Sequence, residues 1–181
     1  MKYMIASDIH GSLFYAEELF RRYEEEKPEK LLLLGDLLYH GARNDLPKGY
    51  DTKGLTALLN RYKDVIFAVR GNCDAEIDQM VLEFPIMADY LEMVVDGRLW
   101  LVTHGHVFDE NSILPHPAGT VLLHGHTHLK VLEQRGDFYY VNPGSVSIPK
   151  DPDGIGSYMV YEDGTFTIKD LQGNVLKEMT L

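Results

Sequence analysis

The first half of the chain alternates short apolar runs with longer amphipathic stretches. Three apolar runs have the length of buried strands: 2–7, 30–36 and 64–72. Between them, two stretches repeat apolar residues at the spacing of one helix face: 12–27 and 52–63. Ser12 is a suitable N-cap for the first of these helices. The order strand, helix, strand, helix, strand predicts a parallel sheet.

The second half carries a different pattern, in which strand-like runs are joined by tight-turn sequences. Residues 91–105 form two such runs on either side of Asp96-Gly97, a strong hairpin signal. Similar turn sequences follow later: Arg135-Gly136-Asp137, Asp163-Gly164 and Gly173-Asn174. We therefore expect the C-terminal third to be mostly antiparallel. Because no linker or repeat interrupts the chain, we expect one domain over residues 1–181 with an α/β fold (α+β in some schemes).

Composition narrows the class of partner. The 181 residues include 17 Lys and Arg against 28 Asp and Glu, a net charge of −11. This balance argues against a nucleic acid polymer, which needs basic patches, and against an anionic membrane surface. It does not exclude a small phosphorylated substrate, because bound divalent cations can supply the positive charge.

The same composition bears on location. The N-terminal sequence MKYMIASDIHG lacks the apolar core of a signal peptide, and no apolar run approaches the ~18–20 residues of a membrane span. Cys73 is the single cysteine, so the chain has no internal disulfide. We expect a cytoplasmic protein.

Polar side chains collect where the apolar runs end. They are Asp8 and His10, Asp36, Asn72, His104, and the pair His126 and His128. In open α/β sheets, ligands bind outside the carboxyl ends of strands. Each residue alone has an ordinary explanation as a turn former, a helix cap or a structural histidine. Their common placement at five strand ends favours one shared site.

Five short motifs carry a resemblance to a known family. They are DIHG (8–11), GD (35–36), GNCD (71–74), THGH (103–106) and GHTH (125–128). In this order they resemble the signature blocks of the calcineurin-like metallophosphoesterases. HGARND (40–45) and NPGSVSIPK (142–150) are most similar to the bacterial YfcE-type phosphodiesterases. The resemblance implies a four-layer αββα sandwich, two mixed β-sheets flanked by helices, with two metal ions that are usually manganese.

The resemblance also implies a role for each motif residue. Asp8, His10 and His128 match the ligands of a first metal, Asn72, His104 and His126 match those of a second, and Asp36 matches the bridging carboxylate. A mixed imidazole and oxygen set independently suits Mn²⁺, iron, zinc or nickel better than calcium or magnesium. A hydroxide activated by two such ions would attack phosphorus in line.

Two neighbours of the predicted ligands need a separate interpretation. His124 precedes Gly125 and lies outside the motif, so we expect a structural strand residue without a metal role. His106 follows His104 by two residues, and it could donate a hydrogen bond near the site, serve as a general acid, or be exposed.

Other candidates lie in the loops beside the motifs. Arg43 and Asn44 are candidate substrate-binding residues, since an arginine can grip a phosphate with two hydrogen bonds. His40 could line the pocket or be solvated. Asp74 could orient a ligand histidine or cap a helix beginning at Ala75. Cys73 stands where many relatives carry a histidine that protonates the leaving oxygen, and a thiol is a doubtful general acid.

The function that follows from these assignments is a phosphodiesterase acting on a small diester. Alternatives on the same site are a phosphomonoesterase or a nucleotide pyrophosphatase. A protein-binding scaffold of the same fold is a third class, and the complete set of seven ligand positions argues against it. Strands rich in Tyr and Met in the second half could pair with another subunit, which leaves a homo-oligomer open.

Overall fold

The computed structural model describes all residues except 110, 113 and 114. Six strands form the first sheet, in the order β11-β10-β9-β1-β2-β3. Their bounds are β1 (Tyr3–Ala6), β2 (Lys30–Leu33), β3 (Ile66–Ala68), β9 (Ser157–Glu162), β10 (Thr165–Asp170) and β11 (Val175–Thr180). β1, β2 and β3 are parallel, as the sequence predicts, while β9, β10 and β11 add antiparallel neighbours.

The second sheet has five strands, in the order β4-β5-β6-β8-β7. They are β4 (Tyr90–Val95), β5 (Arg98–Thr103), β6 (Val121–Leu123), β7 (Lys130–Arg135) and β8 (Phe138–Pro143). The predicted hairpin at Asp96-Gly97 joins β4 to β5, and both turn residues have positive φ (49° and 77°). This is the combination that a two-residue turn needs between twisted strands. β6 is parallel to both of its neighbours, so the sheet is mixed.

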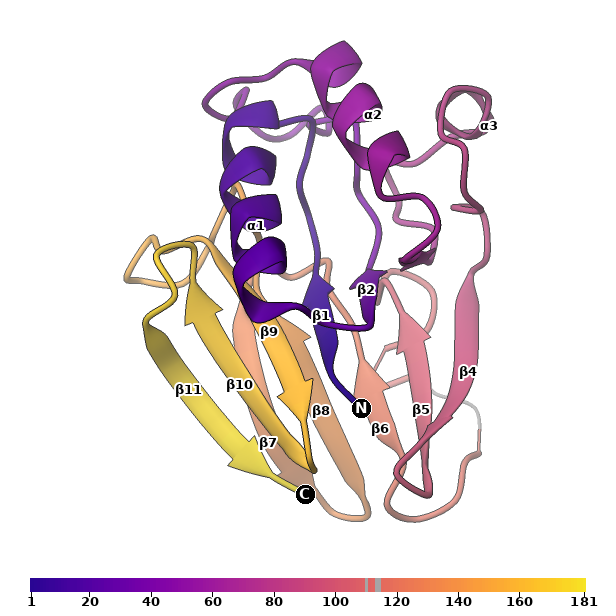
Figure 1. The fold of residues 1–181 in the computed structure, drawn as a ribbon. Helices are drawn as coiled ribbons and strands as arrows, with labels where there is room; N and C mark the ends of the chain where they lie inside the picture. The colour runs from indigo at the N-terminus through magenta and orange to yellow at the C-terminus, as the bar shows by residue number, and fades with distance from the viewer. Residues whose placement is uncertain (110, 113–114) are drawn as a thin grey trace.

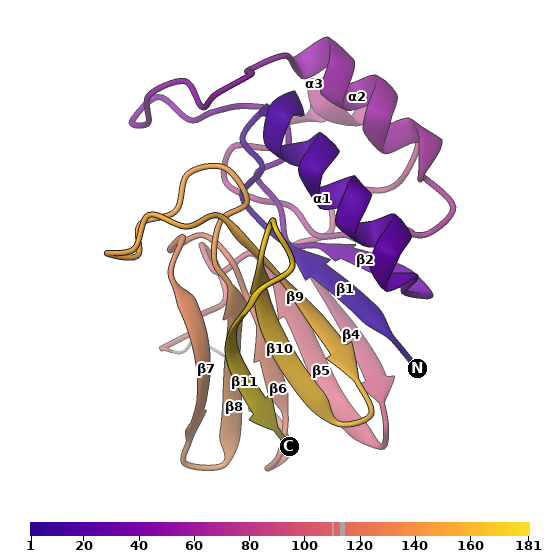
Figure 2. The ribbon, with the colours of Figure 1, turned by 60° about the vertical axis from the view of Figure 1, so that its left-hand side comes forward.

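Two helices cover the first sheet. α1 (Leu13–Glu26) begins at Ser12, whose hydroxyl accepts a hydrogen bond from the Tyr15 N–H at 3.2 Å, as the sequence predicts. α2 (Thr52–Arg61) is capped in the same way by Asp51. Figure 2 shows both helices on one face of the sheet, above β1 and β2.

Side-chain alternation along β1 divides the interior into two layers. Met4 and Ala6 pack under the helices, whereas Tyr3 and Ile5 point into the space between the sheets. The inter-sheet core is centred on Trp100, which is fully buried. Since β1 serves both layers, the loop that follows it is anchored on two sides. Figure 1 shows the carboxyl ends of β1, β5 and β6 at the same end of the sandwich.

The fold class agrees with the expectation of two mixed sheets with flanking helices, and one layer differs. The expected fourth, helical layer on the outer face of the second sheet does not occur in the part of the chain that the structure describes. The apolar cluster on that face, centred on Leu101, Leu122 and Tyr140, contains no helix residue. The reason lies in how the strands of this sheet are connected. The connection from β6 to β8 is itself a strand, β7. The connection from β5 to β6 contains Pro115 and Pro117, and its described part forms no helix. The remaining helix, α3 (Glu76–Gln79), is a single turn.

Among the described residues, no helix is both long enough and apolar enough to cross a membrane.

Candidate metal centre

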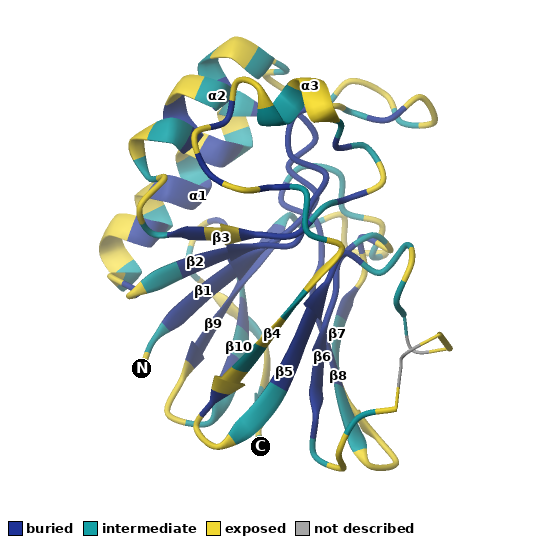
Figure 3. Ribbon diagram, turned by 90° about the vertical axis from the view of Figure 1, so that its right-hand side faces the viewer, coloured by how far each residue is buried: buried dark blue, intermediate teal, exposed yellow. Residues whose placement is uncertain are grey.

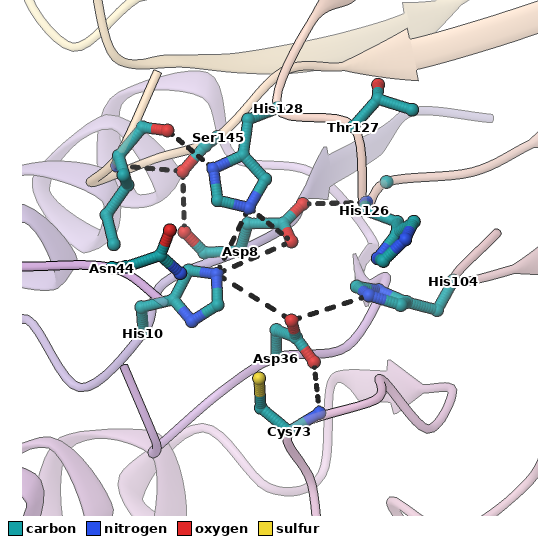
Figure 4. A network of polar contacts seen from close by, with 12 residues as sticks. Asp8, His10, Asp36, Asn44, Cys73, His104, His126, Thr127, His128 and Ser145 are labelled. Carbon is teal, nitrogen blue, oxygen red and sulfur yellow. Dashed lines mark hydrogen bonds and ion pairs between the residues drawn. The ribbon is translucent and has the colours of Figure 1, made fainter. Parts of the chain in front are cut away.

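The predicted site residues meet at the carboxyl ends of the strands. Asp8 and His10 follow β1, Asp36 follows β2, His104 follows β5, and His126 and His128 follow β6 (Figure 4). Five residues of this set have a left-handed backbone: Asp8 (φ 57°), His10 (50°), Asp36 (56°), His126 (65°) and His128 (60°). Non-glycine residues rarely adopt this conformation, and such strain is concentrated at functional sites. The loops after β1 and β2 are buried (Figure 3), whereas Asn72 is exposed and His126 is half-buried.

Asp8, His10 and His128 form a first group of ligand atoms. The two Nε2 atoms of the histidines lie 3.2 Å apart. Asp8 Oδ1 lies 3.3 Å from Nε2 of His128 and 3.7 Å from Nε2 of His10. All three side chains are buried, and Asp8 Oδ1 has no hydrogen-bond partner in the described part of the chain. A buried acceptor without a partner is costly unless a cation satisfies it.

Backbone carbonyls fix the orientation of three histidine rings. Nδ1 of His10 lies 2.9 Å from the Tyr39 carbonyl, Nδ1 of His104 lies 2.6 Å from that of Leu34, and Nδ1 of His128 lies 2.5 Å from that of Ile148. Because a carbonyl oxygen only accepts, Nδ1 carries a proton, and Nε2 is the ring nitrogen that faces the centre and would bind a metal. This is the usual arrangement of metal-ligating histidines. The donor set therefore fits a divalent transition metal.

Asp36 connects this group to a second one. Its Oδ2 lies 3.7 Å from Nε2 of His10 and 3.5 Å from Nε2 of His104. Asn72 Oδ1 lies 3.1 Å from the same nitrogen of His104, and the His126 ring is centred 5.1 Å from the His104 ring. The structure thus brings all seven predicted ligands together, with Asp36 between the two groups.

Charge at the centre is dominated by the two buried carboxylates. Burial opposes ionisation of Asp8, but the adjacent imidazole of His128 and the charge of His104 hold the pKa of this carboxyl well below its usual range. Burial likewise opposes a charged His104, yet its hydrogen bond with Asp36 and the charges of Asp8 and Asp36 raise the pKa of the imidazole to about 9. In both cases paired opposite charges outweigh desolvation. The centre is built to hold positive charge.

Asp74 has a role that neither sequence interpretation anticipated. Its Oδ2 accepts hydrogen bonds from the backbone N–H groups of Asp36 and Gly71, and its Oδ1 accepts one from Leu37, each at 2.8 Å. It bonds to no ligand histidine, and α3 has its N-cap at Ala75, so both predicted roles are wrong. Asp74 instead joins the loop after β2 to the loop after β3. Gly71 is required there, since a Cβ atom would lie 2.1 Å from Asp36 Oδ1.

Two serines that sequence reasoning did not assign hold the strained first loop. Ser145 Oγ donates to the Asp8 carbonyl at 2.8 Å, and Ser147 Oγ donates to the Ile9 carbonyl at 2.8 Å. Both lie in the segment NPGSVSIPK, which carried the family resemblance without a stated role. The two serines of that segment were the feature of the sequence that could have indicated this role.

Of the three clustered histidines, His124 lies just beyond β6, which ends at Leu123, so the expectation of a strand residue is wrong by one position. His124 is buried, with Nδ1 at 3.3 Å from the Gly125 carbonyl and from Asn142 Nδ2. It belongs to none of the groups of convergent ligand atoms in the described residues. The Gly125 position is closely packed, because a Cβ atom there would lie 1.9 Å from Ser7 Oγ. The chain therefore turns after His124, and the following histidines face the centre.

A cleft of about 610 Å³ opens over the centre. Its walls include both predicted substrate-binding residues, Arg43 and Asn44, together with Tyr39, Cys73 and Lys150. Burial and the neighbouring Asp36 raise the pKa of the Cys73 thiol to about 12, which weakens it further as a proton donor.

The two remaining candidate histidines are only half-buried. His40 packs edge-on against the rings of Tyr39 and Tyr50, at centroid distances of 4.7 and 5.4 Å, and is not part of the wall of the cleft. The His106 ring lies 5.3 Å from the His104 ring.

A sandwich of two mixed sheets with imidazoles and carboxylates converging at its strand ends defines a metallophosphoesterase. The chain belongs to the calcineurin-like phosphoesterase superfamily, whose domain matches residues 1–164. It is 46% identical over 150 residues to phosphodiesterase YfcE of Escherichia coli K12, covering 83% of this chain and 82% of that protein. It is 27% identical over 157 residues to phosphodiesterase MJ0936 of Methanocaldococcus jannaschii, covering 80% and 83%.

Solved structures agree with this membership. The structure of the Escherichia coli phosphoesterase YfcE superposes with a TM-score of 0.96 at 40% identity, over 99% of both chains. Vacuolar protein sorting 29 of Cryptosporidium parvum superposes with a TM-score of 0.65 at 15% identity, over 99% and 98% of the two chains. This second likeness concerns the fold alone.

Proposed function

We propose that the chain is a phosphodiesterase that uses two divalent metal ions to hydrolyse a small phosphate diester. The observation that carries the proposal is the approach of the His10 and His128 Nε2 atoms to 3.2 Å beside Asp8, with Asp36 reaching toward both His10 and His104. Two relatives over most of the chain are named phosphodiesterases, which supports the same activity.

In this proposal each group of side chains holds one ion. Asp8, His10 and His128 would hold the first, Asn72, His104 and His126 would hold the second, and Asp36 would contribute to both. Mn²⁺ suits the mixed nitrogen and oxygen set, and iron, zinc or nickel would also fit it. Two such ions supply Lewis-acid activation of water and neutralise charge on the phosphoryl oxygens.

Protein groups fix the geometry around these ligands. The Cys73 N–H donates to Asp36 Oδ1 at 2.8 Å, which leaves Oδ2 directed toward the two histidines. Asp74 holds the backbone of Asp36 itself. The Asp36 carboxylate is therefore preorganised, and it would lose little conformational entropy on binding metal.

The residues of the cleft favour a small anionic substrate. Arg43 and Lys150 form no ion pair among the described residues, so both are available to an anionic phosphate. Asn44 is held by a hydrogen bond from its Nδ2 to the His40 carbonyl at 2.8 Å, which leaves its Oδ1 for a substrate donor. A cleft of this size takes a small molecule, in keeping with the net charge of −11.

The test is metal-dependent turnover of a chromogenic diester. Protein stripped with a chelator should be inactive on bis(p-nitrophenyl) phosphate, and Mn²⁺ should restore turnover. Wild-type protein should hydrolyse this diester faster than p-nitrophenyl phosphate, which separates a diesterase from a monoesterase. Equal rates before and after metal removal would refute the proposal.

A further inference from the structure

A second cleft opens on the other side of His126. It has a volume of about 460 Å³. Its apolar wall is formed by Leu129 and Val131, and polar side chains line the rest: His106, Asp109, Asn111, His124, Thr127 and Arg135. His126 lies in the wall of this cleft and also in that of the first one. A phosphate placed against His126 therefore has an open cavity on each side.

The two clefts differ in chemistry. The first contains the cations Arg43 and Lys150, for which no ion pair occurs in the described part of the chain. In the second, the guanidinium of Arg135 is already paired with Glu133, at 2.7 Å. The second cleft also has an apolar wall, formed by the exposed side chain of Leu129 and by Val131.

One buried polar atom of the second cleft has no hydrogen-bond partner among the described residues. It is Nδ1 of His106. The His106 ring lies 6.3 Å from the His126 ring, close to where the phosphate would bind. Because this ring nitrogen is already out of contact with water in the folded protein, a hydrogen bond to a ligand oxygen requires no further desolvation of it.

The phosphorus of a diester carries two ester groups, only one of which leaves. Negative charge develops on the leaving oxygen, and cations stabilise that charge best. The first cleft provides such cations. The retained ester group develops no charge, so an apolar wall with one polar contact suits it. A cavity of about 150 Å³ already holds a benzene ring, so the second cleft has room for an aryl or ribosyl group.

We infer that the second cleft, walled by Leu129 and Val131 beside His106, binds the ester group of the substrate that is retained on phosphorus. The inference rests on the proposed phosphodiesterase function. It makes Leu129 a specificity-determining residue, and it explains a preference for diesters over monoesters, because a monoester leaves this cleft empty.

The experiment compares two diesters with the same leaving group. Phenyl p-nitrophenyl phosphate and methyl p-nitrophenyl phosphate both release p-nitrophenolate, and they differ only in the retained group. The readout is the ratio of kcat/KM for the phenyl ester to that for the methyl ester. Leu129→Trp fills the cleft, and Leu129→Ala shortens its apolar wall. Val175→Trp is the matched control, because it places the same side chain on an exposed site of β11 that lines neither cleft.

The wild-type protein should favour the phenyl ester. Leu129→Trp should lower the ratio about tenfold or more, and Leu129→Ala should lower it a few-fold, whereas Val175→Trp should leave it unchanged. Metal content is measured for each variant, because Leu129 is adjacent to His128.

Three results would overturn the inference while leaving the proposed function intact. One is a wild-type ratio in both Leu129 variants. Another is an equal loss of kcat/KM on both esters in Leu129→Trp with metal content retained. The two esters share their leaving group, so an equal loss would place that group in the second cleft. The third is loss of metal in Leu129→Trp together with a wild-type ratio in Leu129→Ala. If wild-type protein with Mn²⁺ hydrolyses neither diester, the proposed function itself fails.

Discussion

Replacement of Asp74 should destabilise the protein, because this buried carboxylate joins the loops after β2 and β3. The carboxylate is buried, and it accepts three backbone hydrogen bonds of 2.8 Å, from Asp36, Leu37 and Gly71. Leaving a buried donor without its acceptor costs about 1–3 kcal/mol. Since the three losses share one site and are not additive, Asp74→Ala should cost about 3–5 kcal/mol.

Asp74→Asn provides the graded comparison. Its single carbonyl oxygen can keep the two bonds of Oδ2, but its NH₂ group then faces the Leu37 N–H, donor against donor. The expected loss is about 1–3 kcal/mol, smaller than for Asp74→Ala. Both variants should also bind metal more weakly, because the backbone of Asp36 is no longer held.

Urea unfolding of the metal-free proteins at pH 8 measures these differences. Burial raises the pKa of Asp74 to about 6, so the carboxyl is ionised at this pH and both oxygens accept. A chelator is needed because metal bound to the folded state alone would mask the loss. If Asp74→Ala unfolds within about 0.5 kcal/mol of the wild type, the role assigned to Asp74 is wrong.

Three further predictions concern other parts of the chain. His128→Ala should cut diester turnover by orders of magnitude while His124→Ala mainly lowers stability; matching activity losses in both folded variants would contradict the division at Gly125. Cys73→Ala should leave the dependence of kcat on leaving-group pKa unchanged and steep, and a flat wild-type dependence that steepens in this variant would make the thiol the general acid. Burial of Glu26 opposes its ionisation, but a hydrogen bond from Lys169 outweighs this effect and lowers the pKa of Glu26 below its ordinary 4.5. The stability advantage of wild type over Glu26→Gln should therefore be full above pH 4.5 and shrink as the pH falls further, and a difference independent of pH in thermal unfolding would contradict this.

The strands and the convergence of the candidate ligand residues could be predicted, because both depend on local sequence. Side chains along β1 alternate between two faces because of the geometry of a strand. The glycines after the strands mark the points where the backbone turns sharply. Asp8, His10 and His126 could be placed at strand ends by order alone. The parallel core and the Asp96-Gly97 hairpin followed from the same local patterns.

The supporting groups could not be predicted because their partners are backbone atoms of distant segments. Asp74 bonds to backbone atoms 37 and 38 residues away, and Ser145 to a carbonyl 137 residues away. Backbone donors and acceptors are present at every residue, so no sequence pattern identifies which ones are left to be satisfied. The missing fourth layer has a similar origin, since it depends on how β7 crosses between two strands.

The measurement that tests the central claim most directly is the metal stoichiometry of Asp36→Asn, determined by equilibrium dialysis with Mn²⁺ alongside diester turnover. The wild-type protein should bind two equivalents. Asp36→Asn removes the one carboxylate placed between both groups of ligands, so it should bind fewer than two equivalents and lose about 10²-fold or more in kcat. Two equivalents of Mn²⁺ in Asp36→Asn, with turnover at the wild-type rate, would contradict the account.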